Sequence, residues 1–112
     1  MKLKLNNTVW TLGIMREKDD PDTWGITHTS KLTINISDGL SLPNAKTTIT
    51  HEVVHAYLFS HGFTQPTHET AMLFSEEQTC DFIAMNIDNI MDASRKVYQW
   101  YLKETKKGKK AE

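Results

Sequence analysis

The chain has 112 residues, which suits one domain with a hydrophobic core and is too short for a second. Its 38% hydrophobic and 24% charged residues are ordinary for a globular protein. Thirteen Lys and Arg residues against fourteen Asp and Glu leave a net charge of -1, which argues against nucleic acid as a partner.

Cys80 is the only cysteine, which excludes an internal disulfide and a zinc site made of cysteines alone. The first residues carry two lysines but no apolar run of the length of a secretion signal. No later stretch is apolar enough over the length of a membrane span. We therefore expect a protein of the reducing cytoplasm with no membrane partner.

The first forty residues carry the alternating pattern of strands. Apolar residues between positions 3 and 14 predict a short strand, with a short helix as the alternative. Residues 16–22 are polar and predict a loop. Residues 24–42 alternate with a period of two and are rich in Thr and Ile, so they predict a β-hairpin or a three-stranded antiparallel sheet, with Asp38 and Gly39 as a hairpin-type turn.

A helix is predicted next. Asn44 is a suitable N-cap, and the apolar pattern runs to about His61, where Gly62 is the expected stop. Residues 75–78, Ser-Glu-Glu-Gln, have the form of a capping box and predict the start of a second long helix. Asp92 is a suitable cap for a third helix. We expect one domain at residues 1–102 and a frayed, lysine-rich tail at residues 103–112.

Residues 51–55 of the first predicted helix read His-Glu-Val-Val-His. On a helix this H-E-x-x-H spacing places His51 and His55 one turn apart on the same face, where both imidazoles can bind a single ion. Zinc in catalytic sites binds such nitrogens and keeps one position open for water. Glu52 is then the candidate base that takes a proton from that water. The pattern predicts a catalytic Zn²⁺ site.

A third ligand is needed, and the second helix offers one. Glu77 is followed four residues later by Asp81, so both carboxylates lie on one helical face. Glu77 can then bind the metal while Asp81 accepts the free ring N–H of a ligand histidine. Glu76 is the neighbouring alternative, without an Asp at the same spacing. His61 is another, at the metzincin spacing but with Leu58 where that pattern has Gly.

Other residues are candidates for a further ligand or for stabilising a reaction intermediate. His68 is the remaining candidate ligand, on the basis of its loop position alone. His28 and Tyr98 are candidates to stabilise the oxyanion of a reaction intermediate, with Tyr57 and His68 as further candidates.

Residues 47–56, followed by residues 77–84 (Glu-Gln-Thr-Cys-Asp-Phe-Ile-Ala), resemble the ImmA/IrrE-type zinc metallopeptidases. The second motif of that family reads roughly E-x-x-A-N/D-x-F-A, so Cys80 and Ile83 depart from it. The resemblance implies His51, His55 and Glu77 as zinc ligands, Glu52 as the base and Asp81 as support for a ligand. It also implies a protein or peptide substrate, in this family often a repressor of a phage or mobile element. Residues 32–37 resemble the sheet edge that receives the substrate.

We expect an α+β fold: a small zincin-like domain with a short antiparallel sheet packed on the H-E-x-x-H helix and one or two further helices. The expected activity is zinc-dependent hydrolysis of a peptide bond. Two alternatives stay open. One is a non-catalytic zinc-binding regulatory or phage accessory protein with the same fold. The other is a SprT-like DNA-associated protease, which the lysine-rich tail and His61 favour and the nearly neutral net charge does not.

Overall fold

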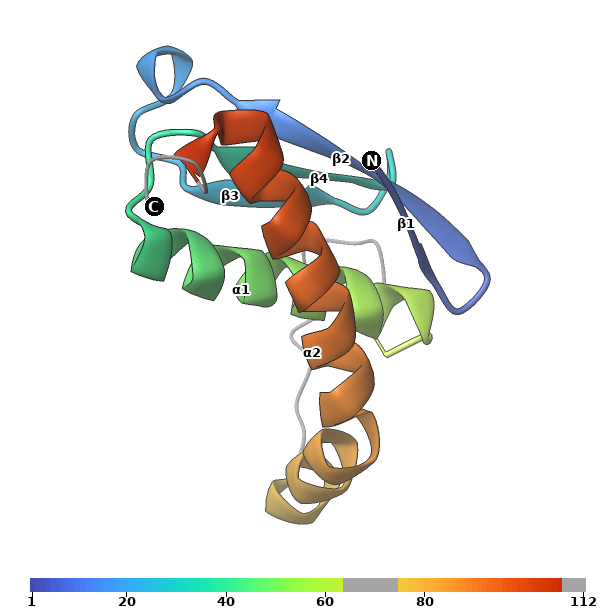
Figure 1. Cartoon of the computed structure of the whole chain (residues 1–112). Coiled ribbons are helices and arrows are strands. Elements are labelled where there is room, and N and C mark those ends of the chain that lie inside the picture. Colours follow the sequence, from blue (N-terminus) through green and yellow to red (C-terminus); the bar gives the residue numbers. More distant parts are fainter. Residues whose placement is uncertain (64–74, 108–112) are drawn as a thin grey trace.

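The structure is a computed structural model and describes residues 1–63 and 75–107. A four-stranded sheet lies over two long helices, so the molecule has two layers (Figure 1). The predicted α+β class is confirmed. In the described part of the chain, no helix is both long and apolar enough to cross a membrane.

The sheet contains β1 (Lys2–Leu5), β2 (Thr8–Met15), β3 (Gly25–His28) and β4 (Thr33–Ser37) in the order β1-β2-β4-β3. The β1–β2 and β3–β4 pairs are antiparallel, whereas β2 and β4 are parallel. The sheet is therefore mixed rather than wholly antiparallel. After β2 the chain passes through a short 3-10 helix, η1 (Glu17–Asp19), and returns along the outer strand β3, so that β4 enters beside β2 in the same direction.

The turn positions differ from those that the sequence predicts. Residues 29–32 connect β3 to β4, and Leu32 has a left-handed φ of 54°. Asp38 and Gly39 form a turn that leads from β4 toward a helix, not a hairpin. Asn6 supplies the left-handed residue of the β1–β2 turn, with a φ of 55°, which Asn tolerates better than most residues.

Helix α1 (Leu42–Ser60) contains the whole H-E-x-x-H segment, as predicted. It begins earlier than expected, because Ser41 is the N-cap and its Oγ accepts a hydrogen bond from the Asn44 N–H at 3.3 Å. Pro43 fits the first turn, where its missing N–H costs nothing. The predicted end is confirmed: His61 is the C-cap and Gly62 follows with a φ of 79°.

Helix α2 (Glu76–Thr105) starts at the predicted capping box, with Ser75 as N-cap. The predicted third helix is wrong, since α2 runs through Asp92 as one helix of 30 residues. No Gly or Pro interrupts it, and the Asp92 carboxylate lies 3.3 Å from Lys96 Nζ, one turn further on. Three residues of the expected tail belong to α2, and residues 108–112 lie outside the described residues.

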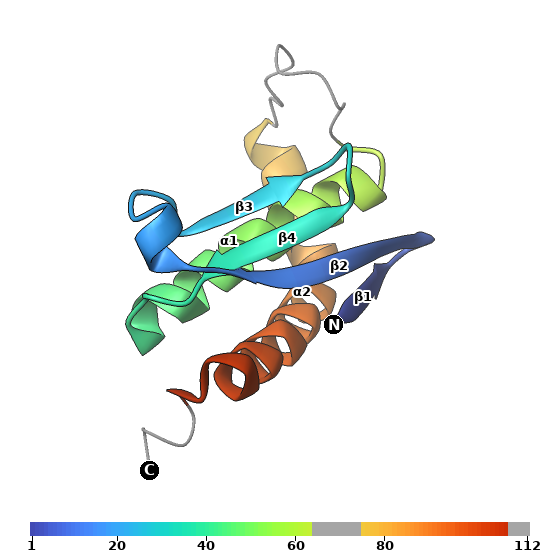
Figure 2. The ribbon, with the colours of Figure 1, turned by 90° about the horizontal axis from the view of Figure 1, so that it is seen from above.

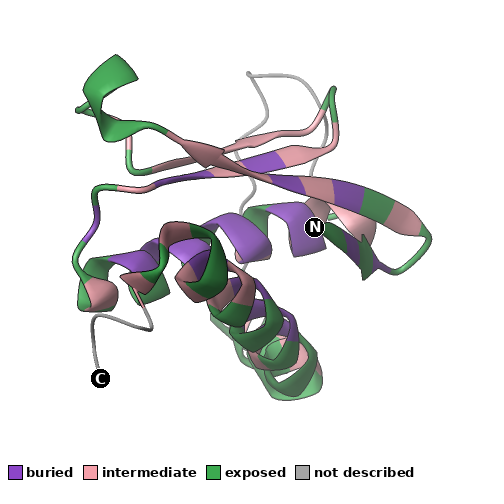
Figure 3. Ribbon diagram, turned by 45° about the horizontal axis from the view of Figure 1, so that its top comes forward, coloured by how far each residue is buried: buried purple, intermediate pink, exposed green. Residues whose placement is uncertain are grey.

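The hydrophobic core lies between the sheet and the helices, where Figure 3 shows the buried residues. The fully buried large side chains come from every layer: Trp10, Ile34, Ile36, Ile49, Val53, Val97 and Tyr101. Two polar contacts lie at the margins of this core. The Trp10 indole N–H donates to Ser60 Oγ at 2.8 Å, and the Tyr101 hydroxyl donates to the Ser37 carbonyl at 2.7 Å.

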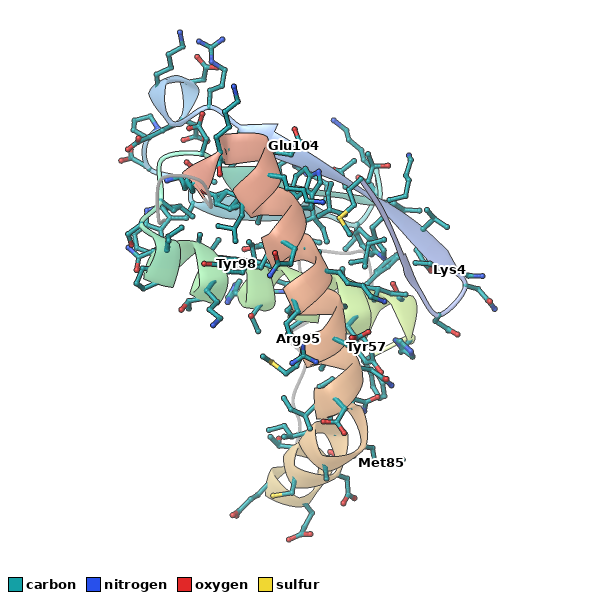
Figure 4. All side chains as sticks on the ribbon, viewed as in Figure 1. Lys4, Tyr57, Met85, Arg95, Tyr98 and Glu104 are labelled. Atoms are coloured by element: carbon teal, nitrogen blue, oxygen red, sulfur yellow. The ribbon has the colours of Figure 1, made fainter. Side chains whose placement is uncertain are left out.

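Only part of α2 packs on this core. Figures 1 and 2 show its first turns extending past α1 and beyond the sheet. Met85 lies on this projecting half, away from the body of the molecule (Figure 4), and is 79% exposed. Ile83 and Ile87 are also exposed, whereas Ile90 is buried. The projecting half carries Glu76, Glu77 and Asp81, which matters for the site.

Candidate metal centre

The two histidines of the H-E-x-x-H segment converge. Their Nε2 atoms are 3.1 Å apart, and their rings are edge to face with centroids 4.8 Å apart. Two nitrogens bound to one tetrahedral zinc at roughly 2.0 to 2.1 Å are about 3.3 Å from each other. The observed separation fits two ligands of one ion, and it equally fits a hydrogen bond between a ring N–H and a ring nitrogen. Both side chains are exposed, so an ion can reach them.

Glu52 is buried on the neighbouring face of α1. One residue is about 100° around a helix, and this rotation turns Glu52 from the histidine face toward β3. Its Oε1 accepts a hydrogen bond from the Thr27 hydroxyl at 2.8 Å. Its Oε2 lies 3.9 Å from His51 Nε2. The fold therefore holds one carboxylate oxygen against the sheet and leaves the other beside the imidazoles.

Gly25 allows α1 to lie this close to β3. A Cβ atom at Gly25 would lie 2.8 Å from Thr48 Cγ2 and 3.0 Å from Glu52 Cγ. Contacts of that length force a neighbour to move, so a side chain at this position would displace α1 or the Glu52 side chain. The close approach is what puts Thr27, two residues along the same strand, within reach of Glu52.

A cavity of about 590 Å³ opens beside Glu52. We call it the Trp24 cavity, because Trp24 lines it with a half-exposed indole. The loop before β3, the start of β3 and one face of α1 form its walls, through Asp22, Thr23, Trp24, Gly25, Thr47, Thr48, His51 and Glu52. The cavity connects the candidate base and one candidate ligand to a space that suits a side chain of a bound molecule.

The structure does not bring the predicted third ligand to the histidines. Glu76, Glu77 and Asp81 are exposed on the projecting half of α2. Within residues 1–63 and 75–107, no group of three or more His, Cys, Asp or Glu side chains is arranged to hold a metal ion. The structure thus brings His51, His55 and Glu52 together, while the third ligand position is not assembled from the described residues.

The two other candidate ligands are His61 and His68. His61 caps α1, where its Nδ1 is 2.9 Å from the Tyr57 carbonyl and its ring stacks on Tyr57 with centroids 4.0 Å apart. There it lines a different cavity, between β1 and α2, together with Asn6 and Asn89. His68 lies outside the described residues.

The candidate oxyanion donors lie apart from Glu52. His28 follows Thr27 on β3, and successive side chains of a strand point to opposite faces, so His28 faces away from α1. Tyr98 lies where α2 passes over α1 (Figure 4), with Lys46 Nζ 5.8 Å from the centre of its ring. Tyr57 donates its hydroxyl hydrogen to Asn86 Oδ1 at 2.6 Å, between the two helices.

The sheet edge next to the site is β3 and not β4. Residues 32–37, which resemble the substrate-binding edge of the ImmA/IrrE-type enzymes, include β4, and β4 is paired on both sides by β2 and β3. The backbone N–H and C=O groups of β4 are therefore taken up by pairing with its two neighbouring strands. Among the strands in residues 1–63 and 75–107, β3 pairs with β4 alone, so its outer backbone groups are the ones open to a further strand.

Sequence reasoning missed Gly25 and Thr27 as site residues, and it named Thr27 only as a strand former. Neither has a motif of its own, because each acts through a contact with a residue about 25 positions away. The one available signal was strand parity: in the predicted strand, Thr27 falls on the face opposite to Ile26 and His28.

Comparison with known proteins gives no match: no family model, no curated protein and no solved structure matches this chain. The residues around His51 therefore carry the functional conclusion by themselves.

Proposed function

We propose that the chain is a zinc-dependent metallopeptidase that hydrolyses a peptide bond in a protein substrate. The observation that carries the proposal is the convergence of His51 and His55 Nε2 atoms, 3.1 Å apart, beside a buried and hydrogen-bonded Glu52. A helix that presents two imidazoles to one point and a carboxylate next to them supplies two ligands and a base at once. The resemblance of residues 47–56 and 77–84 to ImmA/IrrE-type enzymes supports the same conclusion.

His51 and His55 would hold the ion. Zinc in such a site polarises the substrate carbonyl and lowers the pKa of its bound water. Glu52 takes a proton from the attacking water and delivers it to the leaving amine. The Thr27 hydroxyl donates to Oε1, so Oε2, which lies on the His51 side, is the oxygen free to accept that proton. The hydrogen bond also fixes the rotamer of Glu52 against the sheet.

Glu77 is the proposed third ligand, with Asp81 supporting a ligand histidine. Glu77 does not share a metal-binding group with the histidines in the described residues. The proposal therefore requires the first turns of α2 to approach α1 when the ion binds. These turns project from the body (Figure 1), so the core contacts that such a movement would change are mainly those of Phe82, whose ring lies 6.2 Å from that of Tyr57 between centroids.

The proposed substrate is an extended segment of a protein, bound along the free edge of β3. A peptide that pairs there places its backbone beside Glu52, because Gly25 and Thr27 of the same strand contact that residue. By resemblance, a repressor-like regulatory protein of a phage or mobile element is the class of substrate we propose. The cytoplasm is the proposed compartment, in keeping with Cys80 as an exposed free thiol.

A second candidate is a non-catalytic zinc-binding regulatory protein with the same fold. The observation in its favour is the lack of an assembled three-ligand group within the described ranges 1–63 and 75–107. Such a protein would bind its partner along β3 without hydrolysing it.

Replacement of Glu52 by Gln separates the two candidates. Because Gln cannot accept the proton, hydrolysis of a peptide or repressor substrate should fall by about 10² to 10⁴ while bound zinc is retained. Elemental analysis and product detection by mass spectrometry measure the two quantities. His51→Ala is the control and should lose both. Undiminished cleavage by Glu52→Gln, or a wild-type chain that binds no zinc, would overturn the metallopeptidase proposal.

The third ligand is tested by zinc content after single Ala substitutions. Glu77→Ala should release most of the zinc, while Glu76→Ala, one residue away in the same turn, and His61→Ala should retain it. Zinc loss in Glu76→Ala or His61→Ala instead would assign the ligand to that residue.

A further inference from the structure

The Trp24 cavity adjoins the candidate centre but extends beyond it. Its lining runs from His51 and Glu52 at one end to the Asp22–Trp24 segment of the loop before β3. Half of the Trp24 surface is exposed, although a large indole usually packs away from water. Gly25, the next residue along the chain, also lines the cavity. A molecule seated here would cover Trp24 and reach Glu52.

The Asp, Glu, Lys and Arg residues among those that line the cavity are all acidic. Asp22 and Glu52 are acidic, and none of the described residues that line the cavity is Lys or Arg. Lys46 directly precedes Thr47 of the lining but does not itself line the cavity, and its Nζ lies 5.8 Å from the centre of the Tyr98 ring. Lys18, in η1 before the loop, does not line the cavity either, and Arg16 lies 3.9 Å from Asp19 in an ion pair. Along β3, Gly25 lies beside Thr48 and Thr27 beside Glu52, so the residues that precede β3, Asp22 among them, lie toward the start of α1 and away from the histidines. The repulsion between a bound Zn²⁺ and a cationic side chain is weakest there.

We propose that the Trp24 cavity is a specificity pocket for a cationic side chain, Arg or Lys, of the peptide bound along β3. This inference rests on the proposed function, which it deepens by naming the substrate side chain. The apolar stem of such a side chain packs on the Trp24 indole, and its charged group lies over the ring or against the Asp22 carboxylate. Because β3 begins at Gly25, directly after Trp24, the selected residue lies close to the bond that is cut.

The expected selectivity follows from the exposure of the pocket. A cation near an exposed aromatic ring and a pairing with an exposed carboxylate each contribute modestly, since water screens both. Together they amount to about a tenfold preference for a charged side chain over a neutral one of the same shape. The preference should fall with added salt.

The test compares peptides that differ in one central residue. The probe is a seven-residue peptide of Thr and Val with a central Arg, which can shift along β3 until the Arg reaches the cavity. Matched peptides carry citrulline, the neutral isostere of Arg, or norleucine. Dissociation constants are measured by calorimetry on the full chain with a chelator present, so that no cleavage occurs. The same peptides are then offered to the zinc-loaded chain to measure cleavage.

The Arg peptide should bind about tenfold more tightly than the citrulline peptide. Asp22→Asn should lower this ratio to about threefold, because the contact with the Trp24 ring remains, whereas Asp20→Asn, the same charge change two residues away in the same exposed loop, should preserve it. The pocket proposal would be overturned if the two peptides bind with equal affinity or if neither binds. It would also be overturned if both variants lower the Arg-to-citrulline affinity ratio to the same extent. Tighter binding of the Arg peptide without any cleavage would support the pocket and contradict the metallopeptidase proposal. Cleavage without a preference for the Arg peptide would support the metallopeptidase proposal and contradict the pocket.

Discussion

Glu52 is the one charged residue in the buried class within the described part of the chain. A buried carboxylate costs free energy unless hydrogen-bond donors compensate for lost water. Thr27 provides that compensation through its hydroxyl, at 2.8 Å from Oε1, and the same hydroxyl lies 3.2 Å from the Glu52 carbonyl. Thr27 is therefore a positioning residue for the candidate base.

Thr27→Val tests this role. Val keeps the shape of Thr but loses the hydroxyl, so we expect a loss of about 1 kcal/mol in the free energy of unfolding. We also expect roughly a tenfold fall in kcat, with little change in KM, because Glu52 is no longer held in one rotamer. Thr27→Ser should restore kcat, since it retains the donor. A variant whose stability falls while kcat stays unchanged would leave Thr27 with a purely structural role.

At the residue scale, the sequence predicts what local spacing determines. The convergence of His51 and His55 follows from helical periodicity alone, so five consecutive residues were enough to predict it. The contact between Thr27 and Glu52 was out of reach, because it depends on which strand packs against α1. The third ligand was out of reach for the same reason: the position of Glu77 relative to the histidines depends on how two helices cross.

Helix α2 packs on the core along its second half and is largely exposed along its first half. Its second half contributes buried residues to the core, among them Ile90, Val97 and Tyr101. Its first half carries Ile83, which is 51% exposed and lies two turns before Ile90 on the same helical face. The fully buried residues of α2 thus end at Ile90, on an apolar stripe that continues to the exposed Ile83, while Phe82 beside that stripe is partly buried against the core.

Ile90→Ala and Ile83→Ala form a matched pair in this helix. Ile90 is 3% exposed, so its truncation should leave a cavity and lower the free energy of unfolding by about 2 to 4 kcal/mol. The same truncation at Ile83 should cost about 0.5 kcal/mol or less. Urea unfolding measures both. Similar losses for the two variants would mean that the projecting half is packed in solution.

Element boundaries were predictable where capping chemistry is local. The capping box at Ser75 and the stop at Gly62 were both found in the sequence. The start of α1 was misplaced because Ser41 and Asn44 are both suitable caps, and the choice between them depends on how the preceding turn leaves the sheet. The extra break at Asp92 came from treating a good cap residue as a cap, although Asp92 also fits a helix interior when Lys96 follows one turn later.

Tyr101 connects the two layers of the molecule. Its side chain is fully buried and its hydroxyl donates to the Ser37 carbonyl at the end of β4, so the last turns of α2 are tied to the central part of the sheet. Burial, which disfavours the charged phenolate, raises the pKa of Tyr101 from 10.0 to about 12.

This raised pKa predicts a loss of stability in alkali. The folded state holds the Tyr101 proton more tightly than the unfolded state, so the contribution is fully present below pH 10 and is lost as the pH rises toward about 12. The difference in unfolding free energy between wild type and Tyr101→Phe, measured across this range, isolates the effect from that of the lysines. The difference should shrink with rising pH; a constant difference would show that Tyr101 ionises alike in both states.

At the scale of the whole molecule, the sequence predicted the fold class but not the order of the strands. Hairpin pairing is local, and both the β1–β2 and β3–β4 pairs join neighbours in the chain. The parallel β2–β4 pairing joins strands that are separated by a loop, η1 and β3, and no sequence signal specifies it. Because that pairing puts β4 inside the sheet, it also decided which strand borders the site.

The two edges of this sheet are protected unequally. On β1 the outward residues Lys2 and Lys4 are exposed charges, and lysines on an edge strand discourage the approach of another strand. Strand β3, Gly-Ile-Thr-His, carries no Lys, Arg, Asp or Glu. The backbone groups of β3 that would pair with an extended peptide are equally open to β3 of a second copy. Association between two copies would then compete with the binding of the proposed peptide, and dilution of the protein would favour the peptide.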